Sequence, residues 1–170
     1  MLAKTSTLPT MAVAIAAIAA ATLAGAWFFE LAWGLAPCPL CLDQRIPYYI
    51  AVPLALLVGF LARDAEREEA TRAGFIALAV VLGIGAGIGF YHAGVEWKFW
   101  PGPGTCGGIA PAPSGNILDA LKNPPRFVSC EEASWRFLGI SLAGYNVLIA
   151  GTLAWIAARA ARMTSFRGAA

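Results

Sequence analysis

The sequence predicts an all-α membrane protein, a polytopic four-helix bundle in which a long, partly irregular loop joins the third and fourth helices. Apolar residues make up 59% of the 170 residues and charged residues 13%, and the mean hydropathy is +0.67; soluble domains are more polar. Four apolar segments each approach the length of about 20 residues that crosses the hydrocarbon core. We expect one membrane domain, residues 1–170, with spans at about 11–33, 44–62, 73–92 and 137–158.

The first segment has two interpretations. Lys4, the alanine-rich run after it and "AGA" at 24–26 are typical of a secretory signal with a small-residue cleavage site. The apolar run nevertheless continues through Trp27, Phe28 and Phe29 to Trp33. This extension favours a helix that stays in the protein.

The second segment is the shortest of the four. It spans the bilayer if Arg45 and Arg63, at its two ends, extend their side chains to the head groups. Pro53 inside the segment predicts a kink, and the sequence does not say whether such a kink serves packing or function.

The third segment contains the glycine-rich run "GIGAGIG" at 83–89. Its spacing does not match a nucleotide-binding loop and no strand precedes it. Gly83 with Gly87, and Gly85 with Gly89, are pairs of small residues that let membrane helices approach closely. We therefore expect these four glycines to pack against neighbouring helices.

The basic residues predict the orientation of the four spans. Lys and Arg gather near the two termini and in the 63–72 connection, so we expect these parts in the cytoplasm. The connections at about 34–43 and 93–136 then lie on the opposite side, where disulfides form and persist. With a net charge of +2 and scattered basic residues, the chain has no patch typical of nucleic-acid binding, and we expect no such partner. All four cysteines fall in the two far-side connections: Cys38, Cys41, Cys106 and Cys130.

The long connection at 93–136 begins with a stretch that is dense in Pro and Gly, "WPGPGTCGGIAPAPSGN". This composition discourages regular structure and predicts a mobile chain around Cys106. The following "NILDALKN", at 116–123, fits either a short interfacial helix or a turn that covers the mouth of the bundle.

The C-x-x-C motif of Cys38 and Cys41 is the strongest chemical signal in the chain. One thiol of such a motif often has a lowered pKa. We expect Cys41 at the N-terminus of the second helix, one helical turn from the cation of Arg45. The motif fits a redox-active dithiol or a small stabilising disulfide. Zinc and haem are weaker alternatives, because there is only one C-x-x-C and no His follows it; we expect no metal.

Three further ionisable residues are secondary candidates. His92 ends the third span close to Glu96, and it fits either a hydrogen-bonded anchor or a proton-handling group beside a redox site. Glu30 lies in the last turns of the first span, where an acid is either functional or merely interfacial.

Three stretches resemble the disulfide bond formation protein B (DsbB) family of bacterial inner-membrane thiol:quinone oxidoreductases. They are "CPLCLDQR" at 38–45, "YHAGVEW" at 91–97 and "SCEEASWRFLGISLAGYN" at 129–146. The resemblance extends over nearly the whole chain. It implies a multi-pass inner-membrane protein with cytoplasmic termini and periplasmic cysteines.

The resemblance also implies the roles of the site residues. Cys106 and Cys130 would form a loop disulfide that oxidises a periplasmic thioredoxin-fold (DsbA-like) partner, with Cys106 taking the mixed disulfide. Cys38 and Cys41 would form the second disulfide, reoxidise the loop pair and pass two electrons to ubiquinone or menaquinone. Cys41 would face the quinone, with Arg45 beside the quinone oxygen and His92 as a further candidate for this site.

One position departs from the pattern of some family members. Gln44 stands where they carry an acid, so we expect Arg45 to lack an adjacent ionic partner. Two other classes of protein remain as alternatives. A vitamin K epoxide reductase-like protein would carry its C-x-x-C late in the chain, and a structural membrane protein would hold two inert disulfides.

Overall fold

The structure is a computed structural model that describes residues 7–106 and 129–165. Four long helices dominate it: α1 (Thr7–Leu31), α3 (Ile46–Leu61), α4 (Glu68–Glu96) and α6 (Leu142–Ser165). Four helical segments of the described chain are long and apolar enough to cross a membrane. The predicted fold class, an all-α membrane bundle of four helices, is confirmed. The segment at 116–123, which we predicted as a short helix or turn, lies outside the described residues.

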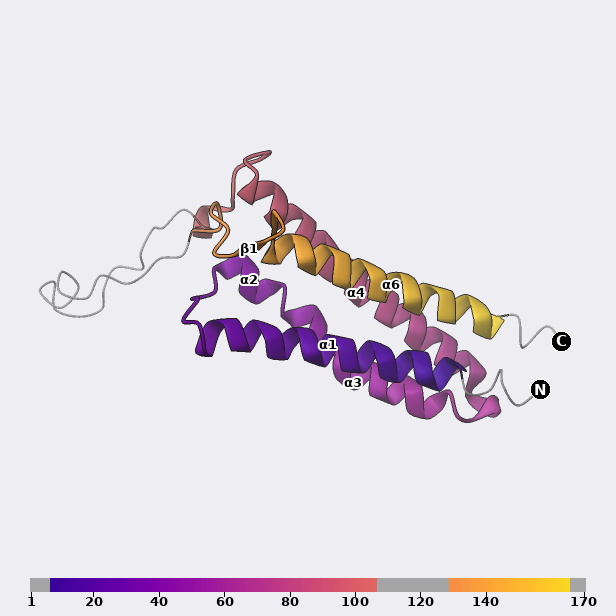
Figure 1. Ribbon diagram of the computed structural model, residues 1–170. Coiled ribbons are helices and arrows are strands. Elements are labelled where there is room, and N and C mark those ends of the chain that lie inside the picture. The colour runs from indigo at the N-terminus through magenta and orange to yellow at the C-terminus, as the bar shows by residue number, and fades with distance from the viewer. Residues whose placement is uncertain (1–6, 107–128, 166–170) are drawn as a thin grey trace, which may run out of the picture.

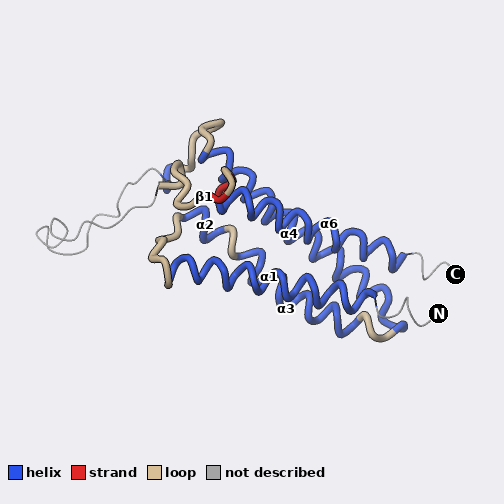
Figure 2. The backbone as a smooth tube through the Cα atoms, viewed as in Figure 1, coloured by secondary structure: helices blue, strands red, loops and turns tan. Residues whose placement is uncertain are grey.

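The short elements gather mostly at one end of the bundle (Figure 1, Figure 2). They are α2 (Pro39–Asp43), η3 (Gly104–Cys106) and a hairpin of β1 (Arg136–Phe137) with β2 (Ile140–Ser141), whose strands pair antiparallel. The two-residue turn of this hairpin, Leu138 and Gly139, has positive φ at both positions (50° and 83°), as a type I′ turn requires. At the opposite end, η2 (Ala65–Arg67) leads into α4.

The helix bounds differ from the predicted spans in two places for clear physical reasons. The second span is interrupted: α2 ends at Asp43, and α3 begins at Ile46 with a proline in its first turn, where a missing N–H costs nothing. The predicted fourth span, 137–158, begins too early because the hairpin occupies 137–141. The Ser141 hydroxyl then accepts a hydrogen bond from the Gly144 N–H, which caps the start of α6.

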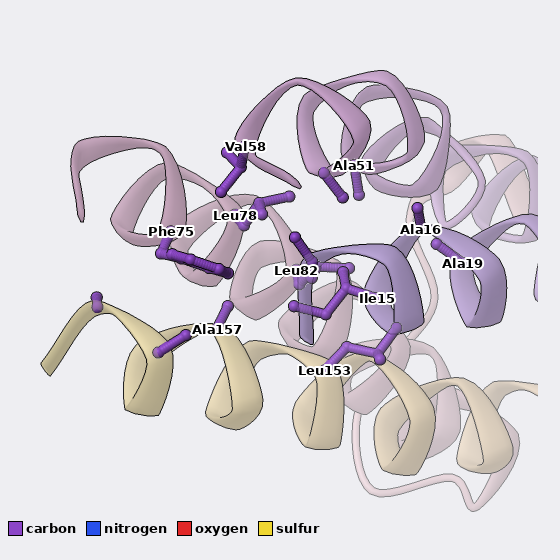
Figure 3. Close-up of a cluster of buried hydrophobic side chains, with 14 of the residues drawn as sticks. Ile15, Ala16, Ala19, Ala51, Val58, Phe75, Leu78, Leu82, Leu153 and Ala157 are labelled. Carbon is purple, nitrogen blue, oxygen red and sulfur yellow. The ribbon is translucent and has the colours of Figure 1, made fainter. Parts of the chain in front are cut away.

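The helices pack as two antiparallel pairs, α1 with α3 and α4 with α6, joined through α3 and α4. In Figure 1 the start of α1 and the end of α6 lie at one end of the bundle, and α2 and β1 lie at the other. Large aliphatic and aromatic side chains fill the space between the helices (Figure 3). The fully buried ones include Ile15, Phe75, Leu78, Leu82 and Leu153.

Two of the four predicted packing glycines are packed. A Cβ at Gly85 would lie 3.1 Å from Pro47, and a Cβ at Gly89 would lie 2.8 Å from the Asn146 amide. Gly83 and Gly87, however, have no neighbour within 4 Å of an added Cβ. The prediction was wrong for this second pair, because only one face of α4 is covered by the bundle. Close approach of α4 to α3 and α6 therefore depends on Gly85 and Gly89.

Candidate redox site

The two cysteine pairs lie together at the end of the bundle opposite the start of α1 and the end of α6. Cys38, Cys106 and Cys130 belong to one buried cluster with Leu40 and Val95. Cys106 and Cys130 form a disulfide. Both are almost completely buried, at 2% and 0% exposure. The loop cysteines thus lie against the C-x-x-C motif, while the Pro/Gly-rich stretch that follows Cys106 lies outside the described residues.

The C-x-x-C motif begins the short helix α2. Cys38 is its N-cap residue, and the Cys38 sulfur accepts a hydrogen bond from the Cys41 N–H at 3.3 Å. The two cysteines are free thiols whose Sγ atoms lie 2.8 Å apart. The structure therefore holds this pair as a dithiol. We had expected Cys41 at the N-terminus of the long second helix. It lies instead in α2, a separate helix of only five residues.

The two sulfurs of the dithiol differ in environment. Cys38 is buried against the loop disulfide, whereas Cys41 is partly exposed. The Cys38 thiol donates a hydrogen bond to the Cys41 sulfur, and this bond together with burial raises the pKa of Cys38. Cys38 therefore keeps its proton at neutral pH, and the Cys41 sulfur accepts the hydrogen bond of the Cys38 thiol.

Arg45 has an ionic partner after all. Its guanidinium Nη1 lies 2.6 Å from Glu30 Oε2, with 12% of the Arg45 side chain and 33% of the Glu30 side chain exposed. The prediction that Arg45 lacks an adjacent partner considered only its neighbour in sequence, Gln44, and was wrong. The acid comes from α1, the helix that faces Arg45 across the site.

A cavity of about 440 Å³ opens beside Cys41. Its volume falls within the range of small-molecule sites, which are mostly apolar with a few polar groups. Arg45, Gln44 and Tyr48 supply polar atoms, and Trp135 and Phe137 stack face to face at its wall with ring centroids 5.8 Å apart. The remaining lining is mainly apolar and comes from α1 and α6. A separate hollow of about 700 Å³ between α3 and α4 contains no cysteine.

His92 lies next to Cys38 and is not one of the residues that line this cavity. Its Nε2 is 3.6 Å from the Cys38 sulfur and 3.8 Å from Glu96 Oε1. Its Nδ1 is 2.7 Å from the amide nitrogen of Gln44. His92 and Glu96 are both buried, and Glu96 Oε2 has no hydrogen-bond partner. His92 is thus a neighbour of Cys38, while Arg45 is the residue that borders the cavity.

A metal ion is poorly matched to this geometry. Cys38, Cys41 and His92 offer three possible ligand atoms within 4.8 Å of one another. Two sulfurs bound tetrahedrally to zinc at about 2.3 Å lie roughly 3.8 Å apart, whereas these two lie 2.8 Å apart. The sulfurs would have to separate before both could bind such an ion.

Sequence reasoning named the cysteines, Arg45 and His92, and it missed one polar residue and an aromatic one. Asn146 lies in the apolar helix α6, and its buried amide reaches Gln44. A polar residue inside a span is itself a signal of function, and it could have been used. The aromatic residue is Trp135, which lines the cavity.

Comparison with known proteins gives one family. The family model described as "Disulfide bond formation protein DsbB" matches residues 9–160. Proteins named "Disulfide bond formation protein B" from Methylococcus capsulatus and Dechloromonas aromatica are 32% and 33% identical to the chain. The matches cover 76% and 71% of this chain and 79% and 73% of those proteins. A protein of the same name from Xanthomonas oryzae is 30% identical, with 76% of each chain covered. No solved structure matches the chain.

Proposed function

Since the chain belongs to the DsbB family and is a multi-pass membrane protein of disulfide bond formation, we propose that it is a thiol:quinone oxidoreductase. It reoxidises a periplasmic thioredoxin-fold, DsbA-like disulfide donor and passes the electrons to ubiquinone or menaquinone. One observation supports this proposal above the others. A loop disulfide and a dithiol share one buried cluster, and the outer sulfur of the dithiol, Cys41, opens on a mostly apolar cavity that also contains Arg45.

In the first step a thiolate of the partner attacks Cys106. The Cys106–Cys130 bond breaks, a mixed disulfide with the partner forms, and Cys130 leaves as a thiolate. The second partner thiol then resolves the mixed disulfide, so that the partner is oxidised and the loop pair is reduced by two electrons. Because Cys106 is 2% exposed, its covering residues must move before the partner can reach it.

In the second step the loop pair is reoxidised by Cys38 and Cys41 in their disulfide form. A thiolate of the loop attacks Cys38, the Cys38–Cys41 bond breaks, and Cys41 leaves as a thiolate near the Arg45 cation. The other loop thiol then attacks its partner sulfur, closes Cys106–Cys130 and releases Cys38. A loop disulfide beside a free dithiol, the arrangement in this structure, is the product of this exchange.

The residues around the cavity fit a quinone. A quinone head group is flat and apolar with polar oxygens at its edge, and the stacked rings of Trp135 and Phe137 and the cation of Arg45 match these features. When bound, a quinone supplies the acceptor for two electrons and two protons. Cys41 brings the sulfur to the cavity, Arg45 stabilises negative charge next to it, and apolar side chains of α1 and α6 exclude water.

The orientation of the chain belongs to the proposal as well. The connection between α3 and α4 and the end of α6 lie at the end of the bundle opposite α2 and β1. These segments carry Arg63, Arg67, Arg72, Arg159 and Arg162. The positive-inside bias then supports one membrane domain with cytoplasmic termini and periplasmic cysteines in the bacterial inner membrane. A green fluorescent protein fused after residue 170 should fluoresce in cells, and a periplasmic reporter at that site should be active if the orientation is reversed.

The function is tested with the purified protein in detergent, a quinone and an excess of reduced thioredoxin-fold oxidase, by following quinone absorbance. We expect quinone reduction that depends on the partner, disappears in Cys41→Ser and falls strongly in Arg45→Met. Arg63→Met, which removes an arginine at the opposite end, is the matched control and should retain the wild-type rate. No reduction of ubiquinone or menaquinone by folded protein would contradict the proposal and support two inert cysteine pairs.

A further inference from the structure

A series of hydrogen-bonded, buried side chains runs from α6 to the dithiol, and it starts at Asn146. The Asn146 amide nitrogen donates to the Gly85 carbonyl at 3.3 Å, and its Oδ1 accepts from the Tyr48 hydroxyl at 2.6 Å. A backbone carbonyl can only accept, so the nitrogen of the amide must face Gly85. The orientation of the Asn146 side chain is therefore fixed by its neighbours.

Gln44 is the next residue in this hydrogen-bond series, and its partners also fix the orientation of its side-chain amide. Its Oε1 accepts from the Asn146 amide nitrogen at 2.8 Å, and its Nε2 donates to the Leu40 carbonyl at 3.1 Å. Turning the Gln44 amide over would set two NH₂ groups against each other and leave the Leu40 carbonyl facing an oxygen. Because the amides of Gln44 and Asn146 are bonded to each other and are little exposed, such a mismatch is costly. The second hydrogen of the Gln44 NH₂ group thus points to His92.

This hydrogen-bond series determines which ring nitrogen of His92 carries the hydrogen. Its Nδ1, 2.7 Å from Gln44 Nε2, must accept a hydrogen bond, so in the neutral ring the hydrogen is on Nε2. Nε2 faces Cys38 Sγ and Glu96 Oε1, at 3.6 and 3.8 Å. Both can accept a hydrogen bond, so these two neighbours of Nε2 are compatible with a donor there.

We propose that Gln44 and Asn146 are positioning residues that hold His92 in its Nε2–H tautomer, as a hydrogen-bond donor to the Cys38 sulfur. This inference rests on the proposed function for its chemical role. When the loop thiols close their disulfide, the bond from a loop sulfur to Cys38 breaks and its electron pair stays on Cys38. The leaving thiolate then meets two N–H groups, the Cys41 backbone N–H and His92 Nε2–H. The proton that the attacking loop thiol gives up ends on Cys38, whose thiol donates to the Cys41 sulfur in the product.

Replacing the amide at position 44 by a carboxylate should change the tautomer of His92. A carboxylate there cannot donate, so Gln44→Glu would require His92 to donate from Nδ1. The ring would then either present a bare Nε2 to Cys38 or become doubly protonated. The amide of Gln44 thus selects a neutral donor ring.

The inference is tested by nitrogen NMR on the full-length reduced protein in detergent. His92 is the single histidine of the 170 residues, so ¹⁵N-histidine labelling gives signals from this ring alone. The two nitrogens are distinguished by their couplings to the ring carbon-bound protons, and a protonated nitrogen is readily told from a bare one. We expect Nε2 protonated and Nδ1 bare at a pH where the ring is neutral.

Two variants test this hydrogen-bond series, and a third is the control. Gln44→Glu should move the hydrogen to Nδ1 or protonate both nitrogens. Asn146→Asp should do the same from a distance, because an oxygen facing Gln44 turns its amide over although residue 146 does not touch the ring. Tyr48→Phe leaves both carbonyl contacts intact and should keep the wild-type tautomer. If one of the first two variants fails to fold, the other carries the comparison.

A protonated Nδ1 with a bare Nε2 in the wild-type protein would overturn the inference. So would a wild-type tautomer in both Gln44→Glu and Asn146→Asp. In stopped-flow single turnover, these two variants should slow closure of the loop disulfide about tenfold, as expected for loss of one hydrogen bond to a charged sulfur. The tautomer is read without turnover, so a wild-type protein with Nε2–H and no quinone reduction would contradict the proposed function alone.

Discussion

The Arg45 guanidinium is held at the edge of the cavity by a carboxylate from another helix. Glu30 Oε2 lies 2.6 Å from Arg45 Nη1, and the arginine is the more buried of the two side chains. A fixed cation orients a polar ligand atom better than a mobile one, because no side-chain entropy is lost when the ligand binds. Glu30 therefore acts on ligand binding through Arg45, although it does not line the cavity itself.

Replacing Glu30 by Gln should release Arg45. We expect the free energy of unfolding to fall by about 1 kcal/mol, since the pair is partly exposed, and the KM for quinone to rise severalfold with a small change in kcat. Glu131→Gln is the matched control, because the Lys98–Glu131 pair is exposed on both sides. Thermal unfolding and quinone titrations in detergent measure both effects. An unchanged KM in Glu30→Gln would show that Glu30 does not position Arg45.

The sequence motif identified the reactive residues but could not identify the residues around them. Cys38, Cys41 and Arg45 stand within eight positions of one another, and their spacing alone indicates thiol chemistry. The partner of Gln44, in contrast, is Asn146, which is 102 residues away in the chain. Contacts of this kind depend on how α6 packs against α4, and no local pattern in the sequence encodes that packing.

Helix α4 approaches its neighbours along one glycine face. Gly85 and Gly89 lie under Pro47 and Asn146, whereas Gly83 and Gly87 are open. Membrane helices associate through close van der Waals contact and hydrogen bonds, because burial from lipid gives little driving force. The Gly89 face also brings Asn146 to the Gly85 carbonyl, so helix packing and the geometry behind the dithiol are linked.

Gly89→Ala should therefore be destabilising. Its Cβ would lie 2.8 Å from Asn146 Nδ2 and 3.3 Å from the Ala143 carbonyl, and we expect the free energy of unfolding to fall by about 1–3 kcal/mol. Gly87→Ala, two residues away, has no atom within 4 Å of its Cβ; it should be neutral or stabilising by up to about 1 kcal/mol. Unfolding in denaturing detergent, followed by circular dichroism, compares the two. Equal stability of both variants would contradict the packing assigned to Gly89.

Hydropathy predicted how many long helices there are and roughly where they lie, but it could not predict where they are interrupted. Residues 39–61 form one candidate span by mean hydropathy, yet the helix is interrupted between α2 and α3 at Gln44 and Arg45, whose side chains bond to Asn146 and Glu30. The hairpin at 136–141 is also apolar in part, and only the positive φ of Leu138 and Gly139 marks its turn. Tertiary contacts of polar side chains accompany the first interruption, and local backbone geometry defines the second.

The bundle divides its functions between its two ends. The cysteines, the cavity and the hairpin lie at one end, and the described arginines of the 63–72 connection and of the end of α6 lie at the other. Between them the core is made of side chains such as Ile15, Phe75, Leu78, Leu82 and Leu153 (Figure 3). Among the described residues, the buried ionisable side chains of His92 and Glu96 lie at the cysteine end.

This aliphatic core has an energetic consequence for the cell. Between the two ends, the described residues include no row of buried ionisable side chains that could carry protons across the bundle. Turnover should therefore be electroneutral and independent of the membrane potential. In proteoliposomes, valinomycin-imposed potentials of either sign should leave the rate of quinone reduction unchanged, and a voltage-sensitive dye should report no charging during turnover. A rate that follows the imposed potential would mean that charge crosses the bundle. An electroneutral enzyme would let disulfide formation continue in cells whose proton-motive force has collapsed, as long as oxidised quinone is supplied.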